Sequence, residues 1–297
     1  MFPAFPSFLP SQVHQLTEPT SIALAQRIQV QSLNLDPAKQ AIETSYVQQG
    51  QGGTPILLLH GFDSSVMEFR RLLPQLASSH ETWAVDLLGF GFTERRGDIP
   101  YSPEVIRKHL YSFWKTLIQR PVILVGASMG GAAVLDFALS YPECVEKVVL
   151  IDSAGFTNGV PLIARYLFPP FDHLAVEFLK SPKLRQRVSE LSYVDKSLAS
   201  EDALVCGSLH VYQQGWHQAI IKFMKSGGYP YLGDKIQQLS QSVLILWGEK
   251  DQILNPQEAY KFEERLPNSK LIWVPESGHV SHLEKPALVA EKIIQFA

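Results

Sequence analysis

The hydrophobic pattern of the chain alternates between short apolar runs and longer amphipathic stretches. Runs typical of strands buried on both faces occur at 56–59, 83–86, 122–125, 147–151, 242–247 and 270–274. Two earlier segments, 28–36 and 41–48, alternate well enough to predict two further strands. Helices are predicted from Ser102, over 132–139 and from about Pro286. Strands separated by helices of this length predict an α/β fold with a doubly wound, mostly parallel sheet.

This alternation is lost between residues 156 and 235. The stretch contains no buried-strand run and predicts several helices, one starting at Ser181-Pro182 and another near Gly215. Because the strand pattern resumes afterwards, we interpret 156–235 as a helical lid inserted late in the sheet. The α/β core would then comprise residues 1–155 and 236–297. We expect residues 1–27 to form an irregular tail, because three prolines interrupt the first ten residues.

Composition indicates a globular protein that acts on small molecules. The 297 residues are 45% hydrophobic and 19% charged, which allows a large core and excludes a disordered chain. A net charge of -3 gives no basic excess for binding nucleic acid or an anionic membrane surface. No apolar run approaches the ~20 residues of a transmembrane helix, and no secretory signal is recognisable, so we expect a cytoplasmic protein. Two cysteines, Cys144 and Cys206, are too few for a disulfide framework.

The predicted strand at 122–125 leads into Gly126-Ala-Ser128-Met-Gly130, which fits the G-x-S-x-G pattern of a nucleophile elbow. A serine at a sharp strand-to-helix turn has strained backbone geometry, and the positions two before and two after it crowd together and favour glycine. Alone, the pattern is weak, and a structural glycine turn is the alternative. The strand before it and the helix after it favour Ser128 as a nucleophile.

A serine hydroxyl needs a base that accepts its proton and a third group that orients the base. Asp251 and His279 follow the last two predicted strands, and the chain order Ser, Asp, His is the one expected for an α/β-hydrolase. The carboxyl ends of parallel strands meet at one edge of a sheet, so these residues should converge. Asp152, which also ends a strand, is the competing acid, and His282 is the competing base.

The chain from about residue 40 to 297 resembles a lid-bearing α/β-hydrolase of the esterase and lipase type. The segments that match, in order, are His60-Gly-Phe62, Asp86-Leu-Leu-Gly-Phe-Gly91, Gly126-Ala-Ser-Met-Gly-Gly131, Trp247-Gly-Glu-Lys-Asp251 and Ser277-Gly-His279. The resemblance implies Ser128 as nucleophile, His279 as general base and acid, and Asp251 as its orienting carboxylate. It also implies an oxyanion hole made by the backbone N–H groups of Phe62 and Met129. We expect His60 and Asp86 to have structural roles.

The expected reaction is hydrolysis of a small, mostly apolar ester through an acyl-serine intermediate. Carbon–carbon bond hydrolysis of a dienone stays open, although Val280 stands where that group commonly carries tryptophan after the catalytic histidine. Acyl transfer would use the same intermediate, and a ligand-binding receptor with an inherited triad is the alternative from another class. Phe156, Trp216 and Phe223 of the lid are candidates to line the substrate pocket, and packing of the lid against the core is the alternative for each of them. Neither a metal ion nor a cofactor is expected.

Overall fold

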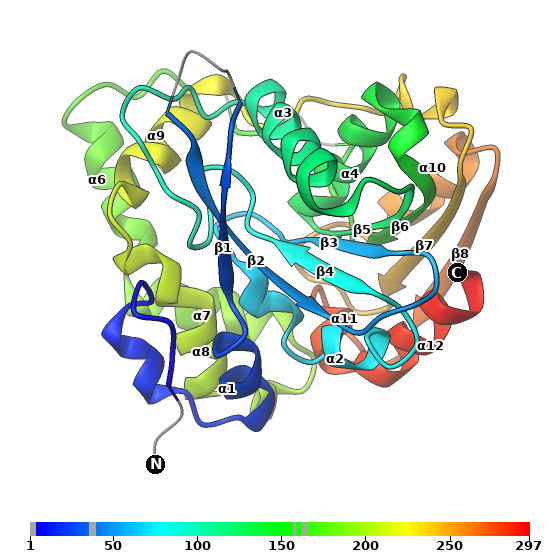
Figure 1. The fold of residues 1–297 in the computed structure, drawn as a ribbon, viewed down its shortest axis with the longest axis horizontal. Coiled ribbons are helices and arrows are strands. Elements are labelled where there is room, and N and C mark those ends of the chain that lie inside the picture. The colour runs from blue at the N-terminus through cyan, green and yellow to red at the C-terminus, as the bar shows by residue number, and fades with distance from the viewer. Residues whose placement is uncertain (1–3, 36–39, 157–158, 162–164) are drawn as a thin grey trace.

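Eight strands in the described residues form a single sheet (Figure 1). The computed structural model describes residues 4–35, 40–156, 159–161 and 165–297. The strands are β1 (Gln29–Leu33), β2 (Ile42–Gln49), β3 (Ile56–Leu59), β4 (Thr82–Val85), β5 (Val122–Ala127), β6 (Val145–Ile151), β7 (Ser242–Gly248) and β8 (Ser269–Val274). Their order is β1-β2-β4-β3-β5-β6-β7-β8, with β1 and β2 antiparallel to their neighbours and the rest parallel. The predicted doubly wound, mostly parallel sheet is confirmed.

Helices cover both faces of this sheet (Figure 1). One face carries α3 (Pro103–Phe113), α4 (Met129–Ser140) and α10 (Gln257–Arg265), and the other carries α1 (Pro19–Ala25), α2 (Leu73–Leu76), α11 (Ser281–Glu284) and α12 (Pro286–Phe296). Successive side chains of β3 enter different hydrophobic clusters: Leu57 and Leu59 pack on the α3 and α4 side, Ile56 and Leu58 on the other. Burial on both faces explains why the apolar run of this strand is continuous.

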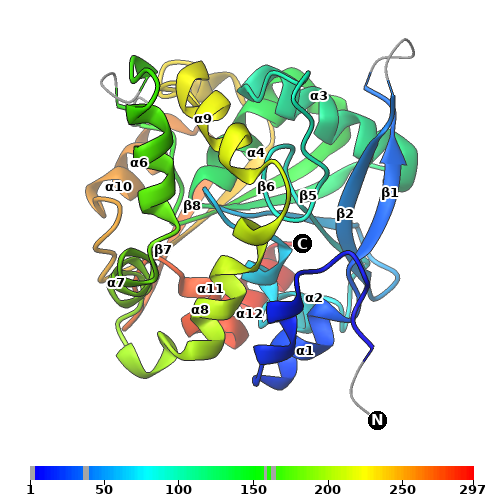
Figure 2. The ribbon, with the colours of Figure 1, turned by 90° about the vertical axis from the view of Figure 1, so that its left-hand side faces the viewer.

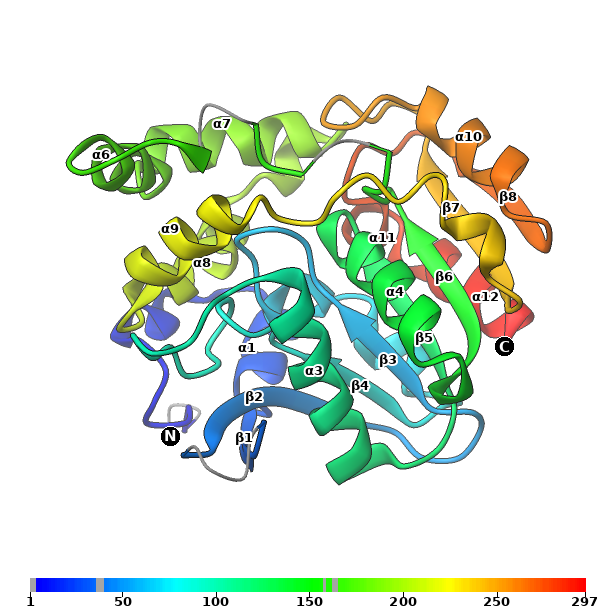
Figure 3. The same ribbon diagram turned by 90° about the horizontal axis from the view of Figure 1, so that it is seen from above.

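Residues 156–235, called the insertion below, lie between β6 and β7. Their described helices are α6 (Phe171–Leu179), α7 (Pro182–Ser192), α8 (Glu201–Ser208) and α9 (Trp216–Ser226). The starts of α7 and α9 match the sequence predictions. In Figures 2 and 3, α6 and α7 form the outer layer of the insertion, and α8 and α9 lie between them and the sheet. None of the helices in the described ranges is both long and apolar enough to cross a membrane.

The N-terminal segment corrects one prediction, because its described part is ordered. Residues Ser11–Gln15 form a 3₁₀ turn and α1 follows from Pro19. The backbone N–H groups of Thr17 and Glu18 donate to Asp202 Oδ1 of α8 at 2.6 and 2.8 Å. Apolar side chains of the segment are buried in the cluster below the sheet: Leu9, Val13, Leu16 and Leu24. The early prolines did not prevent this, because Pro10 stands just before the 3₁₀ turn. A later proline, Pro19, occupies the first position of α1, where no N–H is needed.

Candidate active site

Ser128 occupies a strained turn between β5 and α4. Its backbone has φ 52° and ψ -120°, a conformation that residues other than glycine rarely adopt. A Cβ at Gly126 would lie 2.3 Å from the carbonyl oxygen of Gly130, and a Cβ at Gly130 would lie 2.1 Å from the carbonyl oxygen of Leu59. Both positions therefore require glycine, for the steric reason that the G-x-S-x-G pattern suggests. The turn presents the Ser128 side chain at the carboxyl edge of the sheet.

Asp251 and His279 form a hydrogen-bonded pair at the same edge. Asp251 follows β7, His279 follows β8, and His279 Nδ1 lies 2.9 Å from Asp251 Oδ2. The other carboxylate oxygen of Asp251 accepts the N–H groups of Ile253 at 2.7 Å and Leu254 at 3.0 Å, which fixes its orientation. The pairing makes Nδ1 the protonated nitrogen and leaves Nε2 as the basic one. Burial disfavours the imidazolium, but the hydrogen bond and charge of Asp251 outweigh it and raise the pKa of His279.

The competing acid and base are engaged elsewhere. Asp152 accepts hydrogen bonds from the Gly248 N–H at 2.6 Å and from the Ser281 hydroxyl at 2.7 Å, and burial raises its pKa to about 7. His282 Nε2 lies 3.4 Å from Glu68 Oε1, and its ring packs on Phe69. Neither Asp152 nor His282 lines the cavities that contain Ser128. The geometry therefore favours Asp251 and His279.

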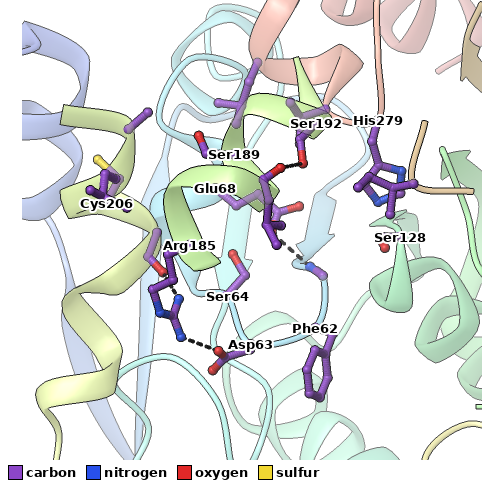
Figure 4. Close-up of a pocket in the computed structure, with 18 of the residues that line it drawn as sticks. Phe62, Asp63, Ser64, Glu68, Ser128, Arg185, Ser189, Ser192, Cys206 and His279 are labelled. Carbon is purple, nitrogen blue, oxygen red and sulfur yellow. Dashed lines mark hydrogen bonds and ion pairs between the residues drawn. The ribbon is translucent and has the colours of Figure 1, made fainter. Parts of the chain in front are cut away.

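Ser128 and His279 line one cavity of about 370 Å³ (Figure 4). No hydrogen bond joins the Ser128 hydroxyl to the imidazole in the part of the chain that the structure describes. Catalytic hydrogen bonds of this kind are often long in an empty site and shorten when substrate binds. A molecule bound in this cavity could therefore contact both side chains.

The backbone N–H groups of Phe62 and Met129 are available beside Ser128. Neither donates to an acceptor within the described ranges. The loop after β3 lies close to the nucleophile, since a Cβ built at Gly61 would be 3.4 Å from Ser128 Cβ. Glu68 Oε2 accepts the Gly61 N–H at 3.0 Å and holds the loop in place. This buried carboxylate was not singled out from the sequence, which contains no signal linking it to Gly61.

His60 and Asp86 have the structural roles that we expected. His60 Nδ1 donates to the carbonyl of Gly61 at 2.8 Å, and its Nε2 accepts the Leu87 N–H at 3.1 Å. Asp86 accepts the N–H groups of Val66 at 2.7 Å and Phe92 at 2.8 Å. Both side chains are fully buried and tie together the loops after β3 and β4.

Asp63, directly after Phe62, connects the same loop to the insertion. Its Oδ1 accepts hydrogen bonds from Trp216 Nε1 at 2.7 Å and His210 Nε2 at 2.9 Å, and its Oδ2 is paired with the guanidinium of Arg185 (Figure 4). The partners come from α9, the 3₁₀ turn before it and α7. Burial opposes ionisation, but these partners hold the pKa of Asp63 below its usual range. Asp63 is adjacent to the His-Gly-Phe segment, yet nothing in the sequence identifies its partners.

A second cavity, of about 320 Å³, meets the first at Ser128. Phe62, Ser128 and Leu179 line both, and the second is otherwise walled mainly by apolar side chains, among them Met129 and Phe223. Phe223 is 2% exposed and packs edge-to-face on Phe90. Phe223, one of the three candidate pocket residues, thus lines the same cavity as Ser128.

The other two predicted pocket residues need correction, because they line neither cavity. Phe156 packs against Phe262 of α10 with ring centroids 4.5 Å apart. Trp216 is 1% exposed and uses its indole N–H on Asp63. Both aromatic side chains are engaged in packing the insertion against the core. Periodicity indicated that they face inward but not which interior surface they face.

No group of three or more His, Cys, Asp or Glu side chains is arranged to hold a metal ion among the residues that the structure describes. Cys144 and Cys206 are both buried, free thiols.

Comparison with known proteins agrees with this geometry. Residues 54–286 match the family described as alpha/beta hydrolase fold. The chain is 36% identical to the alpha/beta hydrolase domain-containing protein VTE7 of Arabidopsis thaliana, over 99% of this chain and 90% of that protein. It is 26% identical to Lipase 1 of Psychrobacter immobilis, over 86% of this chain and 80% of the lipase.

A further relative is the 2-hydroxy-6-oxo-6-(2'-aminophenyl)hexa-2,4-dienoic acid hydrolase of Metapseudomonas resinovorans. It is 29% identical, over 86% of this chain and 87% of that enzyme. A crystal structure of a serine hydrolase involved in carbazole degradation superposes with a TM-score of 0.74 at 25% identity, covering 91% of this chain and 98% of that chain. The chain therefore belongs to the α/β-hydrolase fold family and is a hydrolase of that superfamily.

Proposed function

We propose that this hydrolase cleaves a small, mostly apolar ester through an acyl-serine intermediate. The observation that carries the proposal is the hydrogen-bonded Asp251–His279 pair, whose histidine lines the same cavity as a serine held in strained geometry. The backbone N–H groups of Phe62 and Met129 beside that serine, which have no acceptor among the described residues, would supply partial positive charge to an oxyanion. The constellation contains the nucleophile, base, orienting group and oxyanion donors that acyl transfer requires.

In the acylation step, His279 Nε2 accepts the hydroxyl proton as Ser128 Oγ attacks the ester carbonyl. The carbonyl oxygen becomes an oxyanion, which the N–H groups of Phe62 and Met129 stabilise. The imidazolium then donates its proton to the departing alkoxide, and the carbon–oxygen bond of the ester breaks. Asp251 stays ionised throughout and stabilises the imidazolium through Nδ1.

Deacylation repeats these steps with water. His279 removes a proton from the water as its oxygen attacks the acyl carbon, and the same N–H groups stabilise the second oxyanion. Ser128 leaves as an alkoxide and regains its proton from the imidazolium. An acceptor alcohol in place of water would make the reaction an acyl transfer.

The two cavities indicate the size and polarity of the two parts of the substrate. Because they meet at Ser128, an ester bound there would direct its acyl and alcohol parts into different cavities. The smaller cavity is mostly apolar, with Ala132, Val160, Phe223 and Met224 in its wall. The larger cavity contains charged groups, which include Glu68 and Arg185. We therefore expect an uncharged apolar group on one side of the scissile bond and tolerance of polar atoms on the other.

Carbon–carbon bond hydrolysis is the second candidate, because one relative is named as the hydrolase of a dienoic acid. The same serine, histidine and oxyanion donors serve both reactions. The two candidates differ in substrate, so an activity screen across nitrophenyl esters of increasing acyl length, a lactone and a dienone separates them.

The decisive experiment combines this screen with the variant Ser128→Ala. We expect wild-type protein to hydrolyse short esters and to be labelled at Ser128 by a fluorophosphonate. Ser128→Ala should abolish labelling and lower turnover by about 10⁴-fold or more. Unchanged turnover in the variant would contradict the mechanism. Labelling without multiple turnover on any substrate would indicate a ligand-binding receptor instead.

A further inference from the structure

The outer face of α6 and the segment before it expose a group of large apolar side chains. Tyr166, Phe168, Phe171, Leu174 and Phe178, which we call the α6 surface, are each between 53% and 78% exposed. Phe171, Leu174 and Phe178 fall within one side of the helix at the spacing i, i+3, i+7. Single exposed apolar residues are common on proteins, but a contiguous group of this size marks an interaction site.

This exposure results from the way in which α6 is held. The opposite side of the helix packs toward α9, with Val176 buried and Asp172 Oδ2 bonded to Lys225 Nζ at 2.5 Å. These contacts direct the apolar side outward, where the insertion has its outer layer (Figure 3). The helix thus uses Val176 and the Asp172–Lys225 ion pair on the side that faces α9, and it presents phenylalanine and leucine on the outer side.

Three cationic residues follow the α6 surface along the chain, and the ammonium of the first, Lys180, lies 5.2 Å from the ring centroid of Trp216. Lys180 ends α6, and Lys183 and Arg187 follow on α7, the latter two exposed. Lys180 has Glu177 at 3.6 Å and Arg187 has Glu190 at 3.9 Å, whereas Lys183 pairs with no carboxylate among the described residues. An exposed apolar face with lysine and arginine at its border is the pattern of a helix that lies in the interface of an anionic bilayer. A second copy of the chain fits less well, because two-fold pairing would bring like charges together.

Apolar residues that follow the α6 surface along the chain line the candidate active-site cavities. Leu179, one residue after Phe178, lines both cavities, and Leu184 and Val188 of α7 line the larger one. Val188 is also 47% exposed, so it belongs to the outside of the molecule and to the cavity wall. A lipid-embedded ester could therefore pass from the bilayer to the cavity along adjoining apolar side chains.

We propose that the α6 surface binds the interfacial region of an anionic lipid bilayer and directs the cavity mouth toward substrates embedded there. Membrane binding is a property of the α6 surface alone, whereas the delivery of an ester to Ser128 rests on the proposed function. The phenylalanine and leucine side chains would enter the acyl boundary, and the lysine and arginine side chains would remain among the lipid headgroups.

The test is co-sedimentation of the full chain with vesicles of phosphatidylcholine alone and of phosphatidylcholine with phosphatidylglycerol. We expect wild-type protein to sediment with the mixed vesicles, and the variant F171S/L174S/F178S to bind them at least about tenfold more weakly. K183E/R187E should weaken binding to the mixed vesicles only. Y260S, at a side chain that is 50% exposed on α10, is the matched control and should bind as wild type does.

Two measurements distinguish membrane binding by the α6 surface from ester hydrolysis at Ser128. The triple serine variant should hydrolyse a short soluble nitrophenyl ester at the wild-type rate, and Ser128→Ala should bind vesicles as wild type does. The thermal transition of the triple serine variant should match that of the wild type, because the three replaced side chains are exposed. Absence of wild-type binding to the mixed vesicles, or equal binding by the triple variant, would overturn the proposal. A concentration-dependent dimer that only the triple variant loses would also overturn it, by showing that a second copy covers this surface.

Discussion

The candidate general base and the loop that carries one candidate oxyanion donor, Phe62, make their supporting contacts with different parts of the molecule. Asp251 orients His279 and is itself oriented by the N–H groups of Ile253 and Leu254, all within loops after β7 and β8. The loop that carries the Phe62 N–H is fixed through Asp63 by side chains of the insertion. The carboxylate that orients His279 thus comes from the core, and hydrogen bonds link the insertion to the His279 loop through Glu284, which accepts the Gly278 N–H and the Val194 and Asp195 N–H groups. The Phe62 loop, by contrast, contacts the insertion directly through Asp63.

This difference predicts two kinds of defect. Changes to the His279–Asp251 pair should remove most of the activity even when the insertion stays docked, because the proposed mechanism relies on this imidazole as its base. Changes to the Asp63 contacts should lower the rate by a graded amount, since a displaced N–H group still stabilises an oxyanion in part. The predictions below run from the largest expected effect to the smallest.

His279→Ala should lower kcat/KM for a short ester by about 10⁴-fold or more, because it removes the imidazole that accepts the Ser128 proton in the proposed mechanism. His282→Ala is the matched comparison and should retain most of the activity, since His282 lines neither cavity. Steady-state kinetics with thermal unfolding of both variants checks this. The reverse ranking would show that His282 is the base.

Asp251→Asn should lower kcat/KM by about 10²- to 10⁴-fold, because the amide can stabilise neither the required tautomer nor the imidazolium. It should also move the acid limb of the pH profile. The carboxylate favours protonated His279, so its loss lowers the pKa of His279 and shifts that limb to lower pH. An acid limb that does not move in this variant would indicate that another residue orients the base.

Asp63→Asn should lower kcat by about 10- to 100-fold with a smaller change in KM, because it removes the charge that holds Arg185 and lets the Phe62 N–H shift. Asp234→Asn is the control, since Asp234 forms an exposed ion pair with Arg265 and should have no effect on kcat. A lower melting temperature with unchanged kcat would instead assign Asp63 a purely structural role.

Trp216→Phe should lower kcat only about 3- to 10-fold, since it removes one of the hydrogen bonds to Asp63 and keeps an aromatic ring. KM should stay unchanged, because Trp216 contacts neither cavity. A strongly increased KM for long-chain esters would mean that Trp216 reaches the substrate.

The features predicted correctly from sequence are those set by short segments. The continuous apolar run Ile56–Leu59 indicates a buried strand, because burial on both faces leaves no position for a polar side chain. Positions 126 and 130 require glycine, because a Cβ at either one would lie less than 2.5 Å from a backbone oxygen. The same locality explains why the ends of β7 and β8 located Asp251 and His279.

The features that were missed depend on contacts between distant segments. Trp216 and Phe223 share one face of α9, yet one faces Asp63 and the other faces the second cavity, which periodicity does not distinguish. Helix α10 was not predicted from the sequence. Its buried residues include Glu258 in the first turn, so its inward-facing side is not a continuous apolar stripe. The N-terminal helix α1 is stabilised by Asp202, which lies far along the chain.

The near-complete burial of α4 has an electrostatic consequence. Ser128 caps the N-terminus of this 12-residue helix, and the residues from Met129 to Leu135 are all buried. An α-helix carries a partial positive charge of about half an elementary charge at its N-terminus. Here that charge lies next to the reacting oxygen and is surrounded by protein, so dissolved ions screen it poorly. The field of the whole helix would then assist the Met129 N–H, and turnover of an uncharged ester should respond little to ionic strength.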